Sequence, residues 1–194
     1  DNFVNNYGNT LVNLRWNHLF TDKLFSNLSV IYSDYFYGLI LDFVGFEWDS
    51  GITNYNLKYD FNHYVSEKVK LNYGINTIYI KFNPGKIIPN REDSGIVAEK
   101  LIDKYANEFA AYIDLEHKIS DAFRLQYGLR YSNFTRLGQD ALNTYANDEA
   151  VIYNEEFKKY ESAEATGIEN FKRSDVISSF NNFEPRISLS YTLD

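Results

Sequence analysis

Phe123-Arg-Leu-Gln-Tyr-Gly-Leu-Arg-Tyr131 is the stretch that decides the fold, because apolar and aromatic residues in it alternate with charged, amide or glycine residues. Thr53-Asn-Tyr-Asn-Leu-Lys-Tyr-Asp-Phe61 repeats the same alternation. Successive side chains of a β-strand point to opposite faces of the sheet, so each stretch has one apolar and one polar face. The pattern returns seven times along the chain and predicts an all-β, antiparallel, up-and-down fold.

The connections between these stretches alternate between short and long. We expect strands at about residues 9–20, 24–37, 51–61, 69–82, 105–119, 123–134 and 183–193. Short turns at about 21–23, 63–68 and 120–122 alternate with long connections at about 38–50, 83–104 and 135–180, and a helical turn is expected at 99–104. In bacterial outer-membrane barrels short turns face the periplasm and long loops face outside. The spacing therefore predicts part of a transmembrane β-barrel with short periplasmic turns and long extracellular loops.

Aromatic residues gather near both ends of the expected apolar faces. They are Trp16, Tyr59 and Phe61 at the periplasmic end, and Tyr32, Phe36 and Tyr131 at the outer end. Amphipathic rings favour the headgroup level of a bilayer, so this distribution is typical of the aromatic girdles of membrane proteins.

The composition excludes several classes of protein. No run approaches the roughly 20 apolar residues of a transmembrane helix. A net charge of −8 argues against binding to nucleic acid, which requires a basic surface. The absence of cysteine excludes disulfides and Cys-based metal sites. The first residues, Asp1-Asn-Phe-Val-Asn-Asn6, do not have the pattern of a signal peptide, and we therefore expect a mature chain or an internal fragment.

An internal fragment is the interpretation we favour, with residues 1–194 as one partial β-barrel domain. Bacterial outer-membrane barrels have an even number of strands, and seven strands that start and end on opposite sides cannot close. An open edge in lipid leaves backbone groups without partners, each at a cost of several kcal/mol. We expect further strands, or other chains, to complete the wall.

Two other classes of protein fit parts of the pattern. A soluble antiparallel β-sandwich binding module also alternates, but its strands are usually about 5–6 residues long, and it does not predict alternating turn lengths. A passive porin or a structural outer-membrane barrel would share every feature of the wall. A plug domain upstream would separate a receptor from a porin.

Two parts of the chain resemble a known family. Ala106-Asn-Glu-Phe-Ala-Ala-Tyr-Ile-Asp-Leu-Glu116 followed by Leu125-Gln-Tyr-Gly-Leu-Arg-Tyr131 resembles consecutive barrel strands of TonB-dependent outer-membrane receptors. Phe183-Glu-Pro-Arg-Ile-Ser-Leu-Ser-Tyr191 resembles a later strand of these barrels. The resemblance covers about residues 106–134 and 181–194. The abundance of Asn, Tyr, Lys and Ile is similar to that of receptors from the Bacteroidetes group.

The resemblance implies a 22-stranded barrel with a plugged lumen in the outer membrane of a Gram-negative cell. Such receptors take up scarce nutrients, typically iron chelates, haem, cobalamin or glycans, with energy delivered by TonB through an N-terminal box. The implied partners are outer-membrane lipid, the rest of the barrel and its plug domain, TonB, and a small or oligomeric nutrient. Neither plug nor box lies in this sequence, so this chain alone is not expected to transport.

Candidate functional residues fall into two groups. Aromatic residues of the expected outer loops could stack on a nutrient: Phe43, Phe46, Trp48, Tyr145, Tyr153 and Tyr160. Cationic residues of the polar faces are expected to face the lumen, where they pair with a plug domain or with Asp60, Asp114 and Glu116: Arg15, Lys58, Lys70, Arg124, Arg130 and Arg186. The third long connection carries nine acidic and five basic residues, which suits either capture of a cationic ligand or divalent ion or a solvated loop.

No catalytic centre, metal site or cofactor is expected. The three histidines, His18, His63 and His117, all lie near the predicted periplasmic end, away from the outer loops. A hydrolase would need a positioned base beside a nucleophile, and no such arrangement is visible. We therefore expect a protein that is not an enzyme.

Overall fold

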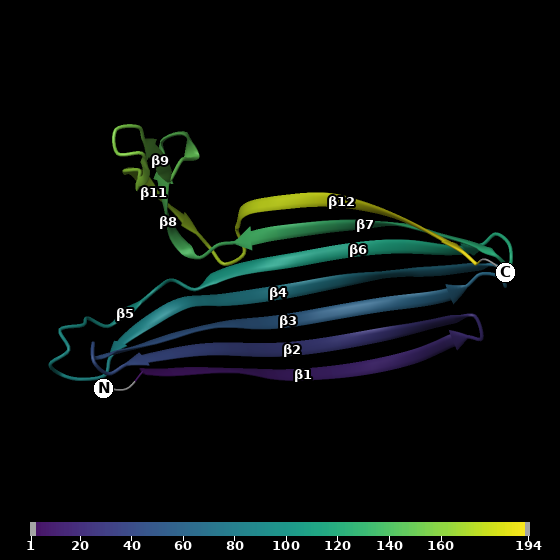
Figure 1. The fold of residues 1–194 in the computed structure, drawn as a ribbon, viewed down its shortest axis with the longest axis horizontal. Helices are drawn as coiled ribbons and strands as arrows, with labels where there is room; N and C mark the ends of the chain where they lie inside the picture. The colour runs from purple at the N-terminus through teal and green to yellow at the C-terminus, as the bar shows by residue number, and fades with distance from the viewer. Residues whose placement is uncertain (1–2, 193–194) are drawn as a thin grey trace.

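The computed structural model describes residues 3–192 and is all-β, with seven long antiparallel strands (Figure 1). The strands pair in the order β1-β2-β3-β4-β6-β7-β12. Their bounds are β1 Phe3–Thr21, β2 Leu24–Leu41, β3 Phe46–Tyr64, β4 Val69–Pro89, β6 Lys104–Lys118, β7 Phe123–Leu137 and β12 Val176–Tyr191. The predicted antiparallel up-and-down arrangement is confirmed. Leu193, the expected end of the last strand, lies outside the described residues.

The first predicted long connection is wrong. β2 and β3 remain paired up to Leu41 and Phe46, so a tight turn at residues 42–45 replaces the loop expected at 38–50. Gly45 adopts the left-handed conformation (φ 84°) that closes this turn, and its N–H donates to the Leu41 carbonyl at 2.8 Å. The apolar/polar alternation stops several residues before the strands do, which is why the sequence suggested a loop.

The second connection is shorter than expected, because β4 continues to Pro89. The helical turn predicted at 99–104 is also wrong. Glu99 and Lys100 form the short strand β5 (Glu99–Lys100), which pairs with Lys86 and Ile87 of β4.

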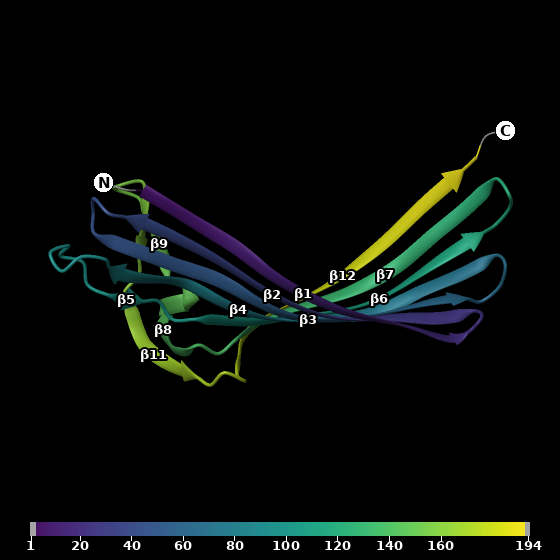
Figure 2. The same cartoon turned by 90° about the horizontal axis from the view of Figure 1, so that it is seen from below.

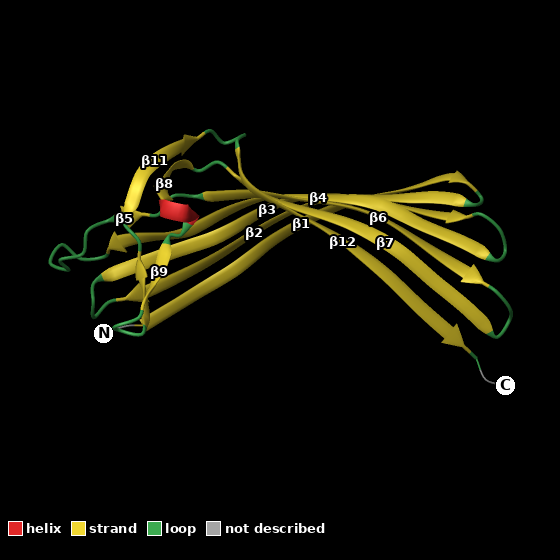
Figure 3. Cartoon of the chain, turned by 90° about the horizontal axis from the view of Figure 1, so that it is seen from above, coloured by secondary structure: helices red, strands yellow, loops and turns green. Residues whose placement is uncertain are grey.

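The third connection folds into an arm, residues 138–175, rather than an open loop (Figure 1). β8 (Asp140–Tyr145) pairs with β11 (Ala165–Phe171), and β9 (Val151–Asn154) pairs with β10 (Lys159–Ser162). One 3₁₀ turn, Ala146–Asp148, follows β8 and is the red segment in Figure 3.

The sheet is twisted and open. In Figure 2 the long strands fan out toward the short-turn end, where β1 and β12 lie far apart. These two strands are the sheet edges and do not pair with each other. Within residues 3–192 only four side chains other than glycine are buried, namely Ser26, Tyr105, Ala110 and Gln139. The described residues form no second large sheet, so they do not make the two packed layers of a β-sandwich.

Candidate functional site

The strand register separates the sheet into an apolar face and a polar face. Directly paired residues lie on the same face of a sheet. One row across the seven strands is apolar: Trp16, Leu28, Tyr59, Ile75, Ala111, Tyr131 and Phe183. The adjacent row, one residue along each strand, lies on the opposite face and is mostly polar: Asn17, Asn27, Asp60, Gly74, Tyr112, Arg130 and Glu184. The alternation read in single strands thus continues across the whole sheet.

The apolar face carries a band of limited height. It covers residues 24–32 of β2, 123–131 of β7 and 183–191 of β12, which is close to the roughly 9–11 residues of a tilted transmembrane strand. Large apolar side chains in it are exposed, including Ile187 (76%) and Leu189 (65%). Exposed apolar surface of this extent indicates contact with another apolar phase or surface.

Aromatic rings line both ends of this band. At the arm end the rings of Tyr32, Tyr55, Tyr79 and Tyr105 follow one another, with centroids 5.3, 6.4 and 6.3 Å apart. At the short-turn end the neighbouring rings, 4.4–6.3 Å apart, belong to Trp16, His18, Phe20, Tyr59, Phe61 and Tyr73. His18 therefore packs among aromatic rings.

The polar face holds all six cationic residues that the sequence singled out. Arg15 and Lys58 share one register row through Ser29, and the others follow at even spacing on the same side of their strands: Lys70, Arg124, Arg130 and Arg186. Three adjoining hollows of about 290, 320 and 560 Å³ open on this face. The first two share Asn76 and Arg130 in their walls.

Three of these cations pair with carboxylates of the same face. Lys58 Nζ lies 3.0 Å from Asp60, Arg124 lies 4.0 Å from Glu116, and Arg186 lies 3.2 Å from Glu184. Lys70 lies over the Tyr64 ring at 5.5 Å. Asp60 and Glu116 are among the partners predicted from the sequence, whereas Glu184 is not.

Glycines make room for contacts between non-adjacent strands. The Tyr112 hydroxyl of β6 reaches over Gly74 of β4 and donates to Asp60 of β3 at 2.5 Å. A Cβ at Gly74 would lie 2.5 Å from the Tyr59 carbonyl and 3.0 Å from the Tyr112 hydroxyl. Only glycine fits this position, and it allows one polar link to span three strands.

Asparagine oxygens on the polar face lack partners. The buried Oδ1 atoms of Asn56, Asn72 and Asn76 accept no hydrogen bond from other described residues. Asn56 and Asn76 also line the smallest of the three hollows. Because an unsatisfied buried acceptor costs free energy, these atoms indicate that the face is completed by water or by further polar groups.

The predicted aromatic capture residues do not form one cluster. Phe43 lies exposed in the 42–45 turn, whereas Phe46 and Trp48 belong to β3 and not to a loop. In the arm, Tyr153 and Tyr160 are paired residues with rings 5.1 Å apart. Tyr145 ends β8, outside that pair.

A clasp at the base of the arm, formed by Gly138, Lys172, Arg173, Asp175 and Tyr105, holds the arm against the sheet. The Arg173 guanidinium lies 3.3 Å from the centroid of the buried Tyr105 ring. A hydrogen bond with Tyr79 raises the pKa of Arg173 above its ordinary value, so the group stays charged. The Gly138 N–H donates to the Asp175 carbonyl at 2.9 Å, and the Lys172 N–H donates to the Asp175 carboxylate at 2.7 Å.

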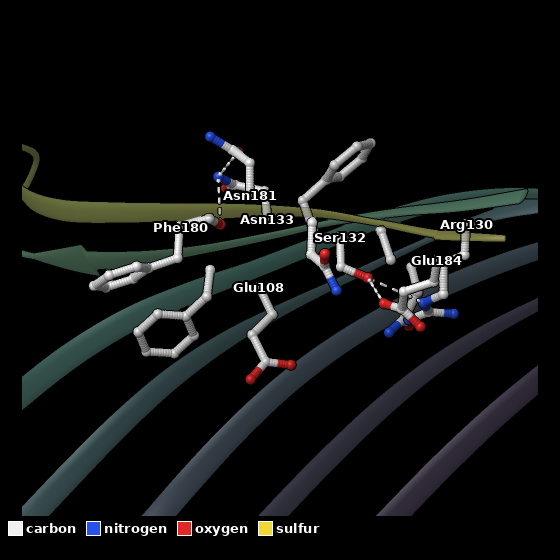
Figure 4. A pocket seen from close by; sticks show the side chains of 12 residues that line it. Glu108, Arg130, Ser132, Asn133, Phe180, Asn181 and Glu184 are labelled. Carbon is white, nitrogen blue, oxygen red and sulfur yellow. Dashed lines mark hydrogen bonds between the residues drawn. The ribbon is translucent and has the colours of Figure 1, made fainter.

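The sequence missed an aromatic pair on the polar face. Phe134 and Phe180 are register partners that line the 320 Å³ hollow together with Glu108. Figure 4 shows Glu108 between Phe180 on one side and the cluster of Arg130, Ser132 and Glu184 on the other. The spacing Arg130-x-Ser132-x-Phe134 was the available signal, because it puts an aromatic ring on the polar side of β7.

Residues 3–192 contain no group of three or more His, Asp or Glu side chains arranged to hold a metal ion. His18, His63 and His117 lie on different strands of the apolar face, with Ser26, Leu71 and Leu125 among their register partners.

In the described part of the chain no helix is long and apolar enough to cross a membrane. No protein-family model, curated protein or solved structure matches this chain.

Proposed function

We propose that this chain is part of the wall of an outer-membrane β-barrel that takes up a nutrient. The observation that carries the proposal is the register: one face of a single sheet is an apolar band of transmembrane height between two rows of aromatic rings, and the other face is polar and hollowed. In this arrangement the apolar face contacts lipid and the polar face lines the lumen.

The open edges support the same proposal. The outer sides of β1 and β12 have unpaired backbone groups, which lipid cannot satisfy. Further strands would pair with both edges and close the wall. The sheet order already follows the chain order, so strands added before β1 and after β12 would extend it without a crossover.

The energised mechanism rests on the resemblance of residues 106–134 and 181–194 to TonB-dependent receptors. Under this proposal the polar face contacts a plug domain, TonB supplies energy through another part of the polypeptide, and the nutrient is an iron chelate, haem, cobalamin or a glycan. The side chains of Arg130 and Asn76, which lie in the walls of two hollows, and the unpartnered amide oxygens of Asn56 and Asn76 suit contacts with such a plug.

Single-cysteine variants test the assignment of the two faces. Residues 1–194 contain no cysteine, so in a cysteine-free background of the whole protein Leu125→Cys and Gln126→Cys each introduce one thiol, on opposite faces of β7. In isolated outer membranes we expect a membrane-impermeant maleimide to label the Gln126→Cys variant through the aqueous lumen and to leave the Leu125→Cys variant unlabelled. A fluorophore at residue 125, attached after detergent extraction, should be quenched by a lipid-embedded quencher once the protein is returned to bilayers. Equal labelling of the two variants in membranes, or recovery of the protein without detergent, would contradict the proposal that this chain forms part of a barrel wall.

The intact mass of the native polypeptide tests the proposal that this chain belongs to a large plugged receptor. Extracted with detergent and identified by peptides of this segment, it should be several times 22.7 kDa, because a plugged 22-stranded barrel is far larger than this chain. A mass near 22.7 kDa would exclude such a receptor and leave a barrel assembled from several chains.

A further inference from the structure

The hollow formed by Phe134, Phe180 and Glu108 has the composition of a site for an organic cation. The two phenylalanines are direct partners on β7 and β12, and Phe180 is 65% exposed. Glu108 of β6 pairs with Phe134 in the same register row. We propose that this hollow binds a guanidinium or primary ammonium group, which rests on the ring faces and pairs with the Glu108 carboxylate.

Glu108 is available for such an ion pair. None of the ion pairs found in residues 3–192 includes it. Arg130, a cation in the wall of the same hollow, donates instead through Nε to Ser132 at 3.2 Å. Ser132 in turn donates to Glu184 at 2.7 Å, which draws that group of side chains away from Glu108.

Aromatic faces select the sign of the ligand charge. A cation over the face of an aromatic ring is attracted by the ring quadrupole, while an anion is repelled. A carboxylate beside the rings acts in the same direction. The hollow therefore offers a cation two attractive contacts, and a neutral group of the same shape loses both.

The arm strengthens the preference for cations. Residues 138–175 carry nine acidic and four basic side chains and leave the sheet close to the ends of β7 and β12, near the hollow. Negative charge of this density attracts cations toward the end of the sheet at which the hollow lies. The base of the arm packs through Arg173 on Tyr105, whose side chain lies on the apolar face, opposite Glu108, so the arm acts on a cation at the hollow only through its long-range charge.

The proposal deepens the proposed function and rests on it in one respect, namely that the polar face lines a lumen. The cationic group then has two possible sources. It is carried by the nutrient, or it is an arginine or lysine side chain of the polypeptide that fills the lumen.

Two amides of equal shape provide the test. N-acetylarginine amide is cationic, and N-acetylcitrulline amide replaces its guanidinium by a neutral urea group. For the intact native protein in detergent, titration calorimetry should show the arginine amide binding at least tenfold more tightly than the citrulline amide. Glu108→Gln should weaken binding by about tenfold and Phe180→Leu by about fivefold. Glu116→Gln, on the same strand and face but paired with Arg124, should leave it unchanged.

The source of the cation is resolved by a photo-cross-linker, p-benzoylphenylalanine, placed at residue 180. If the intact protein does not bind the arginine amide, this group should capture a lumen segment that contains arginine or lysine, and Glu108→Gln should abolish the capture. The proposal is overturned if neither binding nor capture depends on Glu108, or if the citrulline amide binds as tightly as the arginine amide. Because the cysteine labelling of β7 reports the faces independently, a failed cation site would leave the barrel assignment untouched.

Discussion

Replacing Ile187 by arginine is expected to destabilise the protein in a lipid bilayer by about 2–4 kcal/mol, the cost of an arginine on the lipid face at mid-membrane. Ile187 lies at the centre of the apolar stretch 183–191 of β12 and pairs with Tyr127. Its side chain is exposed, and under the proposed function the guanidinium at this position would lie in hydrocarbon. The free energy of unfolding of the intact protein in vesicles, from urea titration, measures the effect.

The neighbouring residue provides the control. Ser188→Arg adds the same side chain to the polar face, one residue along the same strand, and should change the free energy of unfolding by less than about 0.5 kcal/mol. Both variants change strand pairing in the same way, because both place an arginine in β12. The difference between their free energies of unfolding therefore reports the environment of the two faces. Equal losses for both variants would refute the assignment of lipid to the apolar face.

Replacing Gly74 by alanine is expected to cost at least about 2 kcal/mol, because the added methyl group meets backbone rather than a movable side chain. Its Cβ would lie 2.5 Å from the Tyr59 carbonyl, so β3 and β4 must separate locally. The same methyl group would displace the Tyr112 hydroxyl from Asp60 and remove the link across three strands. Urea titration of the intact protein again gives the loss.

Two variants separate the causes of this loss. Gly38→Ala adds a methyl group to β2 where the nearest atom, Asp49 Oδ1, is 3.4 Å away, and should be nearly neutral. Tyr112→Phe removes only the hydroxyl and should cost about 1 kcal/mol. A Gly74→Ala variant no less stable than Tyr112→Phe would mean that the strands adapt to the methyl group without strain.

The sequence was sufficient to predict the two faces but not the ends of the strands. Alternation is imposed where one face meets an apolar surface and the other a polar one, and Phe123–Tyr131 shows it without interruption. Leu39, Ile40 and Leu41 are consecutive apolar residues, and the ladder between β3 and β4 has a bulge between Asp49 and Gly51. The strands therefore continue beyond the point at which the alternating pattern can identify them.

The site residues show the same division. The even spacing of cations such as Arg130 and Arg186 places them on one face from sequence alone. The hollow of Phe134 and Phe180 depends on pairing between residues 46 positions apart, which no local pattern reports. The arm was missed for a related reason, since pairing of Tyr153 with Tyr160 depends on a turn at Asn154 that contains no glycine or proline.

The clasp at the base of the arm lowers the conformational entropy that the arm would lose on binding a partner. A loop of this length without internal structure would lose conformational entropy when it settled on a ligand or partner, at about 1–2 kcal/mol for each residue that became fixed. Here the stacking of Arg173 on Tyr105 and the ladders β8–β11 and β9–β10 have ordered the segment beforehand. Preorganisation of this kind leaves more of the contact energy for affinity. The arm thus holds the paired rings of Tyr153 and Tyr160 in one orientation before any partner arrives.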